Sequence, residues 1–174
     1  MAEESARENP TPAVRLRPAS DDDESFLQTV YGDSRSEELM RVPWSEEQRA
    51  AFVRMQFAAQ QSHYREHFPN ATHEVILVDG RPAGRLYVDR RDVEIRILDI
   101  SMLVEFRGRG VGSLVIKNLI EEADAEGKTV SVYVENYSPS RFLFERMGFR
   151  QVADEGINLL LERPAAAPLK GSGD

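Results

Sequence analysis

The pattern of apolar and polar positions changes its period near the middle of the chain. Ile95 to Val104 is mostly apolar and rich in β-branched residues, which is typical of a strand buried on both faces. From Val111 to Ala123 the apolar residues recur at the spacing of one helical stripe. Between these segments stands the sequence Arg-Gly-Arg-Gly-Val-Gly, numbered 107 to 112. The pattern therefore predicts a central strand that passes through a glycine-rich turn into a helix.

Two helices are predicted earlier in the chain. The first is capped at Ser20, and its acidic first turn, residues 21–24, suits the positive end of the helix dipole. The second begins with the capping-box pattern of Ser45 and Gln48 and runs to about His67. Its apolar face is predicted to contain Phe52, Met55 and Ala59. Polar residues at helical spacing either line a cleft or form a solvated face, and these are Gln56, Gln60, His63 and Tyr64.

Six further strands are predicted from two-residue alternation and from the turn residues beside them. They cover residues 14–17, 73–78, 82–88, 129–135, 149–152 and 157–161. Asp79-Gly80 favours a hairpin turn between the second and third of these, and a charged link at 89–92 leads into the central strand. The central helix is expected to end at Gly127, and a short helix to run from Ser138 to Met147.

The glycine-rich turn is a suitable position for phosphate groups. The first amides of a helix have no carbonyl partners, and glycine lets an anion approach them without a Cβ in the way. Arg107 and Arg109 add positive charge at the same place. A P-loop is excluded because Ser113 follows Gly112 with no lysine before it, and the glycine spacing matches a dinucleotide fingerprint poorly. A plain flexible connection would need the glycines but would leave both arginines unexplained.

Length and composition suit a single globular domain. The chain has 174 residues, of which 41% are hydrophobic and 30% charged. We place the domain at residues 13–163, because 1–12 and 164–174 are rich in polar residues, proline, alanine and glycine and are expected to be disordered tails.

Charge and residue types exclude several functions. The net charge of -8 argues against nucleic acid and anionic membranes as partners, since both require a basic face. No apolar run approaches 18 residues and the first residues do not resemble a signal peptide, so a cytoplasmic location is expected. The sequence contains no cysteine, which excludes thiolate metal ligands and a cysteine nucleophile, and we predict no metal site.

The pattern Arg107-x-x-Gly110-x-Gly112 after a hydrophobic strand resembles the acyl-CoA motif of the GNAT superfamily of N-acetyltransferases. The order of elements from about Val14 to Arg163, and the downstream pair Gly148-Phe149, are similar as well. The resemblance implies an α/β (α+β) fold with a mixed, mainly antiparallel central sheet of six to seven strands and about four flanking helices. It also implies transfer of an acetyl group from acetyl-CoA to a primary amine of a small molecule, amino acid, peptide or protein.

The resemblance also implies where coenzyme A binds. In such enzymes the strand before the glycine turn separates from its neighbour, and the pantetheine arm inserts beside it. By position, Met102, Leu103 and Val104 offer backbone groups to that arm, with an amide near Leu103 facing the thioester oxygen. A plain core strand is the alternative. The diphosphate is expected on the turn and helix start, at Arg107, Gly108, Arg109, Gly110, Val111, Gly112 and Ser113.

Amine attack requires a group that removes a proton, because a free alkyl amine is mostly protonated at neutral pH. Asp99 is the candidate base, since it interrupts an apolar strand just before the expected acyl position. The alternative is a structural ion pair of Asp99 with an arginine such as Arg96 or Arg85. Glu94 is the second candidate base.

Residues 137–149 resemble the second cofactor segment of the family, with two differences. Ser138 stands for the usual asparagine, and Phe144 for the tyrosine that commonly protonates the leaving thiolate. Ser138 and Phe144 are still expected to contact the cofactor. Because phenylalanine has no proton to give, Tyr137, Ser138 or Ser140 acting through water is the expected substitute. The change also supports an alternative function, a non-catalytic acyl-CoA-binding or regulatory module.

Positions that commonly face the acceptor in the family lie on the first two helices and the third strand. Arg35 and Arg85 would favour a substrate with a carboxylate, whereas Glu37, Glu38 and Asp99 would favour a cationic amine. Trp44 is interpreted as core packing. The expected partner is a small-molecule or peptide amine, and a homodimer is left open. The acceptor residues predicted by position are Tyr31, Arg35, Gln60, Tyr64, Arg85 and Tyr87.

Overall fold

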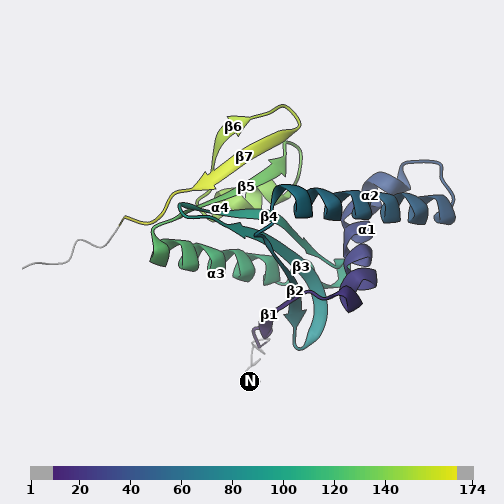
Figure 1. The fold of residues 1–174 in the computed structure, drawn as a ribbon, viewed down its shortest axis with the longest axis horizontal. Helices are drawn as coiled ribbons and strands as arrows, with labels where there is room; N and C mark the ends of the chain where they lie inside the picture. The colour runs from purple at the N-terminus through teal and green to yellow at the C-terminus, as the bar shows by residue number, and fades with distance from the viewer. Residues whose placement is uncertain (1–9, 168–174) are drawn as a thin grey trace, which may run out of the picture.

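A seven-stranded sheet runs through the protein, with α1 and α2 on one face and α3 and α4 on the other (Figure 1). The computed structural model describes residues 10–167. Most of the two predicted tails lies outside this range, and the short parts within it, 10–12 and 164–167, have no regular secondary structure.

The first third of the chain forms one strand and two helices. Their bounds are β1 (Val14–Pro18), a 3-10 turn (Asp21–Asp23), α1 (Glu24–Met40) and α2 (Glu46–His67). Ser20 precedes the 3-10 turn, where its amide and hydroxyl donate to the Asp23 carboxylate, and Asp23 is the residue that precedes α1. The second predicted cap is present. Ser45 and Gln48 form the reciprocal capping box, in which the Gln48 amide donates to the Ser45 hydroxyl at 3.2 Å and Gln48 Oε1 accepts from the Ser45 amide at 2.9 Å.

The remaining elements complete the sheet. They are β2 (Thr72–Val78), β3 (Arg81–Arg90), β4 (Glu94–Met102), a 3-10 turn (Val104–Phe106), α3 (Val111–Glu126), β5 (Thr129–Glu135), α4 (Ser140–Arg146), β6 (Arg150–Asp154) and β7 (Asn158–Arg163). The strand order is β1-β2-β3-β4-β5-β7-β6, and only the β4–β5 pair is parallel. The predicted mixed, mainly antiparallel sheet with about four helices is therefore confirmed. The predicted charged link is shorter, because Asp89 and Arg90 belong to β3.

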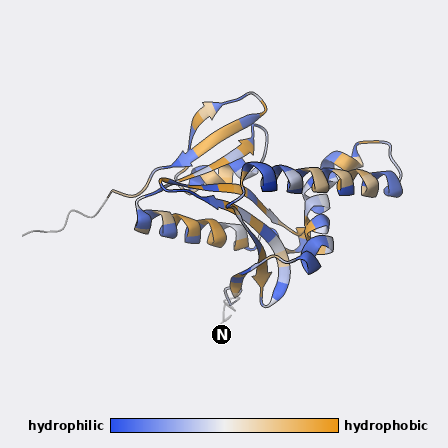
Figure 2. Cartoon of the chain, in the orientation of Figure 1, coloured by the Kyte–Doolittle hydropathy of each residue, from blue (hydrophilic) through white to orange (hydrophobic). Residues whose placement is uncertain are grey.

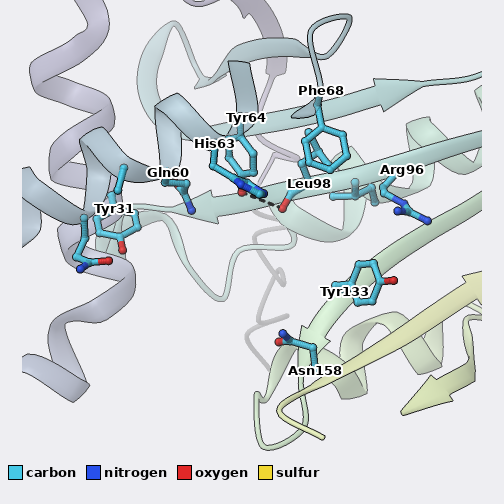
Figure 3. A pocket seen from close by; sticks show the side chains of 12 residues that line it. Tyr31, Gln60, His63, Tyr64, Phe68, Arg96, Leu98, Tyr133 and Asn158 are labelled. Carbon is cyan, nitrogen blue, oxygen red and sulfur yellow. Dashed lines mark hydrogen bonds between the residues drawn. The ribbon is translucent and has the colours of Figure 1, made fainter. Parts of the chain in front are cut away.

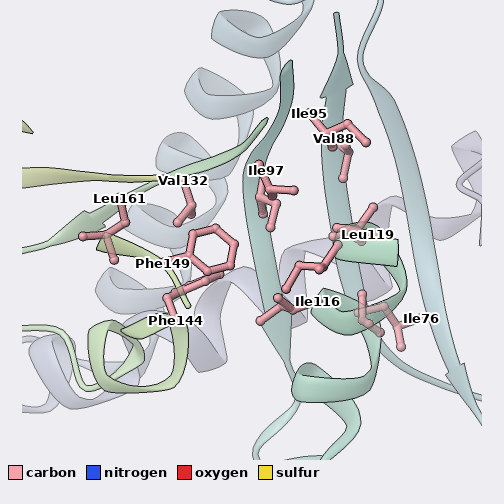
Figure 4. Packing of buried hydrophobic residues seen from close by; sticks show 14 of the residues in the cluster. Ile76, Val88, Ile95, Ile97, Ile116, Leu119, Val132, Phe144, Phe149 and Leu161 are labelled. Atoms are coloured by element: carbon pink, nitrogen blue, oxygen red, sulfur yellow. The ribbon is translucent and has the colours of Figure 1, made fainter. Parts of the chain in front are cut away.

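The main core lies between the sheet and the α3–α4 layer. Figure 4 shows Ile97, Ile116, Phe144 and Phe149 packed together there, and all four are almost fully buried. Figure 2 shows hydrophobic residues along the strands and along α3, between hydrophilic ones. The expectation that the central strand is buried on both faces was wrong: only Ile95 and Ile97 of β4 are buried. The opposite face of β4 points towards α2 and is only partly covered.

A smaller core lies under α1 and α2. The predicted apolar face of α2 was wrong, because Met55 is 58% exposed and Ala59 is also exposed, whereas Phe57 and Tyr64 are buried. Phe57 packs with Leu27 of α1 and with β2. Helix α2 carries apolar residues on two opposite sides, and a helical period alone does not indicate which side meets the sheet.

A β-bulge in β4 determines which side chains face α2. Val88 pairs with Ile97 but Tyr87 pairs with Asp99, so Leu98 is one extra residue in β4. Before the bulge, the odd-numbered residues of β4 point towards α3. After it, Asp99 lies opposite Tyr87 and points towards α1 and α2. Without the extra residue, this carboxylate would point into the apolar core.

The parallel pair of β4 and β5 opens just beyond the same point. Pairing extends only from Glu94–Thr129 to Ile97–Val132, after which β4 continues beside β3 and β5 beside β7. The opening leaves the backbone of 98–102 without a strand neighbour on one side. Separately, none of the helices in the described part of the chain has the length and hydrophobicity that a bilayer crossing requires.

Candidate active site

The turn before α3 presents a run of free amides. Arg107 donates its amide to the Val104 carbonyl at 3.2 Å, and Leu114 donates to the Gly110 carbonyl at 3.0 Å. The six amides between them, from Gly108 to Ser113, donate to no group within residues 10–167. The predicted phosphate-binding set is therefore reduced by one amide, that of Arg107.

The glycines of the turn have two separate roles. Gly108 and Gly110 have positive φ angles, +71° and +76°, which other residues adopt only with strain. Gly112 lies in the first turn of α3, where a Cβ would meet no atom within 4 Å. Its lack of a side chain is therefore not required by packing, and it leaves the amides of α3 open to a ligand.

A cavity of about 460 Å³, here called the turn cavity, extends from this turn along β4. It brings together predicted residues from three separate segments, namely Met102, Arg107, Gly112, Ser138, Ser140 and Phe144. The Arg107 side chain is held in place because its Nε donates to the Met102 carbonyl at 3.0 Å. Ser34 and Ser101 also line the cavity, and sequence reasoning missed both of them.

A second cavity, of about 530 Å³, lies between α2 and the opening of the sheet and is here called the α2 cavity (Figure 3). Three of the predicted acceptor residues line it, Tyr31, Gln60 and Tyr64. The Tyr64 hydroxyl donates to the carbonyl of Leu98, the bulge residue, at 3.3 Å. Burial raises the pKa of Tyr64, so this hydroxyl stays protonated and can keep donating.

Among the lining residues of the α2 cavity that sequence reasoning missed, three carry polar groups: Arg96, Tyr133 and Asn158. They come from β4, β5 and β7, on the two sides of the opening. Alternation along β5 does put Tyr133 on the opposite face from Val132 and Val134, but alternation cannot say where two strands separate.

The two cavities are neighbours along β4. From β4, Arg96, Ile97 and Leu98 line the α2 cavity, whereas Ile100, Ser101 and Met102 line the turn cavity. Asp99 stands between these two groups in the strand and is itself absent from the lining of both cavities. Molecules bound in the two cavities would therefore approach each other beside Asp99.

Asp99 is held by two groups. Its Oδ2 accepts from Nη2 of Arg85 at 2.5 Å, and its Oδ1 accepts from the Ser101 hydroxyl at 2.6 Å. The alternative to a role as base, a structural ion pair of Asp99 with an arginine, is thus present, and the arginine is Arg85. The Asp99 side chain keeps 14% of its surface exposed.

Glu94, the second candidate base, is held more tightly than Asp99. It accepts hydrogen bonds from Ser131, Arg91 and Arg96, the last at 3.0 Å. Burial alone would raise the pKa of Glu94, but these partners outweigh burial and the pKa lies below its ordinary value. Glu94 does not line the α2 cavity.

Three predicted acceptor residues are placed elsewhere. Arg85 is 1% exposed, and besides Asp99 it donates to Gln60 at 2.8 Å. Tyr87 is fully buried and accepts from Gln61. Neither residue lines the α2 cavity, because α2 covers this face of β3. Arg35 lies outside that cavity as well, paired with Glu135 at 3.2 Å and Glu38 at 3.4 Å.

Two of the three predicted backbone contacts on β4 are occupied. The Leu103 amide donates to the Ala83 carbonyl at 2.8 Å, and the Val104 amide to Asp33 at 3.3 Å. The Leu103 amide is therefore engaged, and the oxyanion donor expected near Leu103 would have to be a neighbouring amide. The Met102 carbonyl accepts from Arg107, so it faces the turn cavity. In an extended strand the N–H of a residue points to the same side as its carbonyl, which puts the Met102 amide there too.

Hydroxyl groups remain near Phe144 although the phenylalanine has none. Phe144 is 2% exposed and packs edge-on against Phe149, with ring centroids 5.1 Å apart. The hydroxyls of Ser138 and Ser140 lie 2.8 Å from each other and line the same cavity. Tyr137 is 77% exposed and does not line this cavity.

Comparison with known families and structures gives one consistent result. The sequence model described as the acetyltransferase (GNAT) family matches residues 34–149. No curated protein matches the chain.

Solved structures similar to this chain share its fold at low sequence identity. PaiA N-acetyltransferase from Thermoplasma acidophilum, in complex with coenzyme A, has a TM-score of 0.67 at 14% identity, with 87% of this chain and 99% of that chain covered. An acetyltransferase from Thermus thermophilus has a TM-score of 0.64 at 19% identity, with 88% and 98% covered. Ard1 from Thermoplasma volcanium has a TM-score of 0.59 at 19% identity, with 89% and 99% covered. At these identities the likeness establishes the fold alone.

Proposed function

This chain belongs to the acetyltransferase (GNAT) family, and we propose that it transfers an acetyl group from acetyl-CoA to a primary amine. The amine belongs to a small molecule, an amino acid, or a peptide or protein. One observation carries the proposal: two neighbouring cavities lie along β4 where β5 separates from it, and one of them includes Arg107 and Gly112 of the turn whose six amides donate to no group within residues 10–167. The turn cavity would hold the acyl donor, and the α2 cavity the acceptor.

The residues of the turn fit a diphosphate. The six amides that have no partner within the described part of the chain, and the side chains of Arg107 and Arg109, supply hydrogen-bond donors and positive charge, in a chain whose net charge is -8. The gap beside β4 offers unpaired backbone groups to an extended arm such as pantetheine. Coenzyme A would supply the activated thioester.

In the reaction, the amine nitrogen bonds to the thioester carbon, the carbon–sulfur bond breaks, and one proton moves from nitrogen to sulfur. The Met102 amide, on the same side of the strand as the Met102 carbonyl that accepts from Arg107, would donate to the carbonyl oxygen as negative charge develops on it. Asp99 accepts the proton of the attacking amine, directly or through one water. Arg85 fixes the orientation of the Asp99 carboxylate.

Ser101 offers a route for the returning proton. It lines the turn cavity and donates to Asp99, so it connects the candidate base with the acyl-donor side of the site. Ser101 gives its proton to the thiolate while Asp99 passes the amine proton to the Ser101 oxygen, which restores both groups. This route replaces the missing tyrosine at Phe144. The predicted pair Ser138 and Ser140 is the second source of that proton, because it lines the same cavity.

The test is release of free thiol from acetyl-CoA, measured against a panel of amines. We expect turnover with at least one amine and loss of coenzyme A binding in Gly110→Val, because valine disfavours the φ of +76° and adds bulk beside the amides. Ser101→Ala should lower kcat more than Ser138→Ala or Ser140→Ala if Ser101 is the proton donor. Absence of coenzyme A binding in calorimetry would refute the proposal.

The alternative function is a non-catalytic acyl-CoA-binding or regulatory module. Two observations favour it: Phe144 has no acidic group, and Asp99 is engaged by Arg85 and Ser101. This alternative predicts that coenzyme A binds tightly and that no amine in the panel is acetylated. Native mass spectrometry of the purified protein would detect a retained coenzyme A species.

A further inference from the structure

The α2 cavity has no carboxylate on its wall. None of the 12 residues that line it is aspartate or glutamate. Three acidic residues beside it are paired: Asp99 with Arg85, Glu94 with Arg91 and Arg96, and Glu135 with Arg35. The exposed carboxylate of Glu155 accepts from the Tyr133 hydroxyl at 3.2 Å, but Glu155 does not line the cavity. A polyamine or another polycation would find no counter-charge on the cavity wall itself, and burying its extra charges there would be costly.

One cation does line the cavity. Arg96 uses Nη2 for Glu94 at 3.0 Å and Nε for the Ser131 hydroxyl at 3.3 Å. Its Nη1 donates to no group in the part of the chain that the structure describes, and its Cζ lies 5.4 Å from the centroid of the Tyr133 ring. The contacts with Glu94 and Tyr133 fix the guanidinium, so its free edge is a preformed donor for an anion.

The position of Arg96 relative to the reacting centre sets the size of the acceptor. Arg96 lies three residues before Asp99, a separation of roughly 10 Å along the strand. Its guanidinium is held beside Glu94 and Ser131. An amine that reaches Asp99 through one water and an anionic group at Arg96 can still belong to one small molecule.

The rest of the wall is aromatic and amide-bearing. Rings come from Tyr31, His63, Tyr64, Phe68 and Tyr133, and amides from Gln56, Gln60 and Asn158 (Figure 3). Such a surface favours an apolar or aromatic body with a few hydrogen-bonding groups. A volume of about 530 Å³ is that of a small-molecule site.

From these features we infer that the acceptor is a free α-amino acid with an apolar or aromatic side chain, whose carboxylate binds Arg96. The inference rests on the proposed acyl transfer, because it names the acceptor of the same site. It also changes the prediction from sequence, in which Arg35 and Arg85 were to bind a carboxylate.

The experiment compares matched acceptors. Acetylation of phenylalanine, phenylalaninamide, phenethylamine and spermidine is measured in the wild type and in Arg96→Gln, which removes the charge but keeps a hydrogen-bonding group. We expect phenylalanine to have the highest kcat/KM. We expect Arg96→Gln to raise its KM about tenfold to a hundredfold, as loss of one charge-assisted hydrogen bond would, and to leave phenylalaninamide unchanged.

Arg91→Gln is the matched control. Arg91 also pairs with Glu94, at 3.2 Å, but does not line the α2 cavity, so its removal should not alter the preference for phenylalanine. The inference is overturned if phenylalaninamide or spermidine is the better substrate. It is also overturned if Arg96→Gln weakens phenylalanine and phenylalaninamide equally, or if Arg91→Gln reproduces its effect.

A binding measurement separates this inference from the proposed function. Calorimetry with phenylalanine and phenylalaninamide on the coenzyme A-loaded protein needs no turnover. If no amine is acetylated but phenylalanine binds at least tenfold more tightly than its amide, the proposed acyl transfer is refuted. The inference that the cavity binds an amino acid is then still supported. If both bind equally or neither binds, the ligand class is wrong, whatever the thiol-release assay gives.

Discussion

Removing the Asp99 carboxylate should destabilise the fold strongly, independently of any effect on catalysis. Arg85 is 1% exposed, and Asp99 is the only carboxylate that pairs with it within residues 10–167. Its Nε and Nη1 already have no hydrogen-bond partner in that range. Asp99→Ala would therefore leave an uncompensated charge inside the protein.

The expected magnitude follows from burial. Removing one partner of a buried ion pair costs about 3 to 5 kcal/mol, whereas an exposed pair is worth about 1 kcal/mol or less. The Arg85 guanidinium also lies over the rings of Tyr31 and Tyr87, 5.5 and 4.9 Å from their centroids. These cation–π contacts would still stabilise the charge in the variant, so the loss of stability should be near the lower end of that range. We therefore expect about 3 kcal/mol, or a melting temperature lower by about 6 to 12 °C for a domain of this size.

The assay is urea unfolding at pH 7 followed by far-UV circular dichroism. Two variants provide controls. Glu135→Ala removes the partner of Arg35, in a pair whose side chains are 35% and 33% exposed, and should cost no more than about 1 kcal/mol. Adding Arg85→Met to Asp99→Ala replaces the stranded charge with an apolar side chain and should recover most of the loss.

Two results would refute this reasoning. If Asp99→Ala cost less than about 1 kcal/mol, the guanidinium would have to be solvated or paired in some other way. If the double variant were as unstable as Asp99→Ala alone, the loss would come from packing around Asp99 and not from an unpaired cation.

Three further predictions concern other parts of the molecule. Phe144→Tyr should raise kcat by about tenfold or more if thiolate protonation limits the rate, and an unchanged kcat would mean that another group already supplies the proton. Gly84→Ala should lower the urea midpoint, because a Cβ would lie 2.3 Å from the Ser101 carbonyl oxygen; an unchanged midpoint would show that β3 and β4 can shift. The hydrogen bonds from Arg17, both 2.7 Å, lower the pKa of the Asp23 carboxyl, so its stabilising contribution is present above about pH 4 and is lost as pH falls through the lowered pKa. Asp23→Asn should therefore cost about 1 kcal/mol at pH 7, with the difference from wild type shrinking in acid, and a constant difference across that range would contradict it.

Features governed by short-range physics were predictable from the sequence. The capping box at Ser45 is complete within four residues. The Asp79-Gly80 turn has two positive φ angles, 49° and 78°, as a two-residue hairpin turn requires. Gly127, with a φ of 68°, ends α3 where predicted. In each case the residues that determine the geometry are neighbours in the chain.

Features that depend on distant partners were not predictable in the same way. The burial of Arg85 depends on α2 lying across β3, and a sequence does not show which arginine a helix will cover. The apolar side of α2 was wrong for the same reason, since Met55 and Phe57 lie on different sides and only the tertiary contacts select Phe57. The residues missed in the α2 cavity, such as Arg96 and Tyr133, come from two strands that meet only after folding.

The bulge at Leu98 explains why the sequence indicated Asp99 as a candidate residue but did not predict which way its side chain points. Strict alternation would put Asp99 on the face of Ile95 and Ile97, where a carboxylate would be buried in an apolar core at high cost. One extra residue moves Asp99 to the face of Arg85, and pairing of β4 with β5 ends just before that residue. A single bulge therefore lets the Asp99 carboxylate pair with Arg85, and it lies on β4 between the residues that line the two cavities. Deleting Leu98 should consequently damage stability and acyl transfer together, whereas Leu98→Ala, which keeps the register, should spare the ion pair.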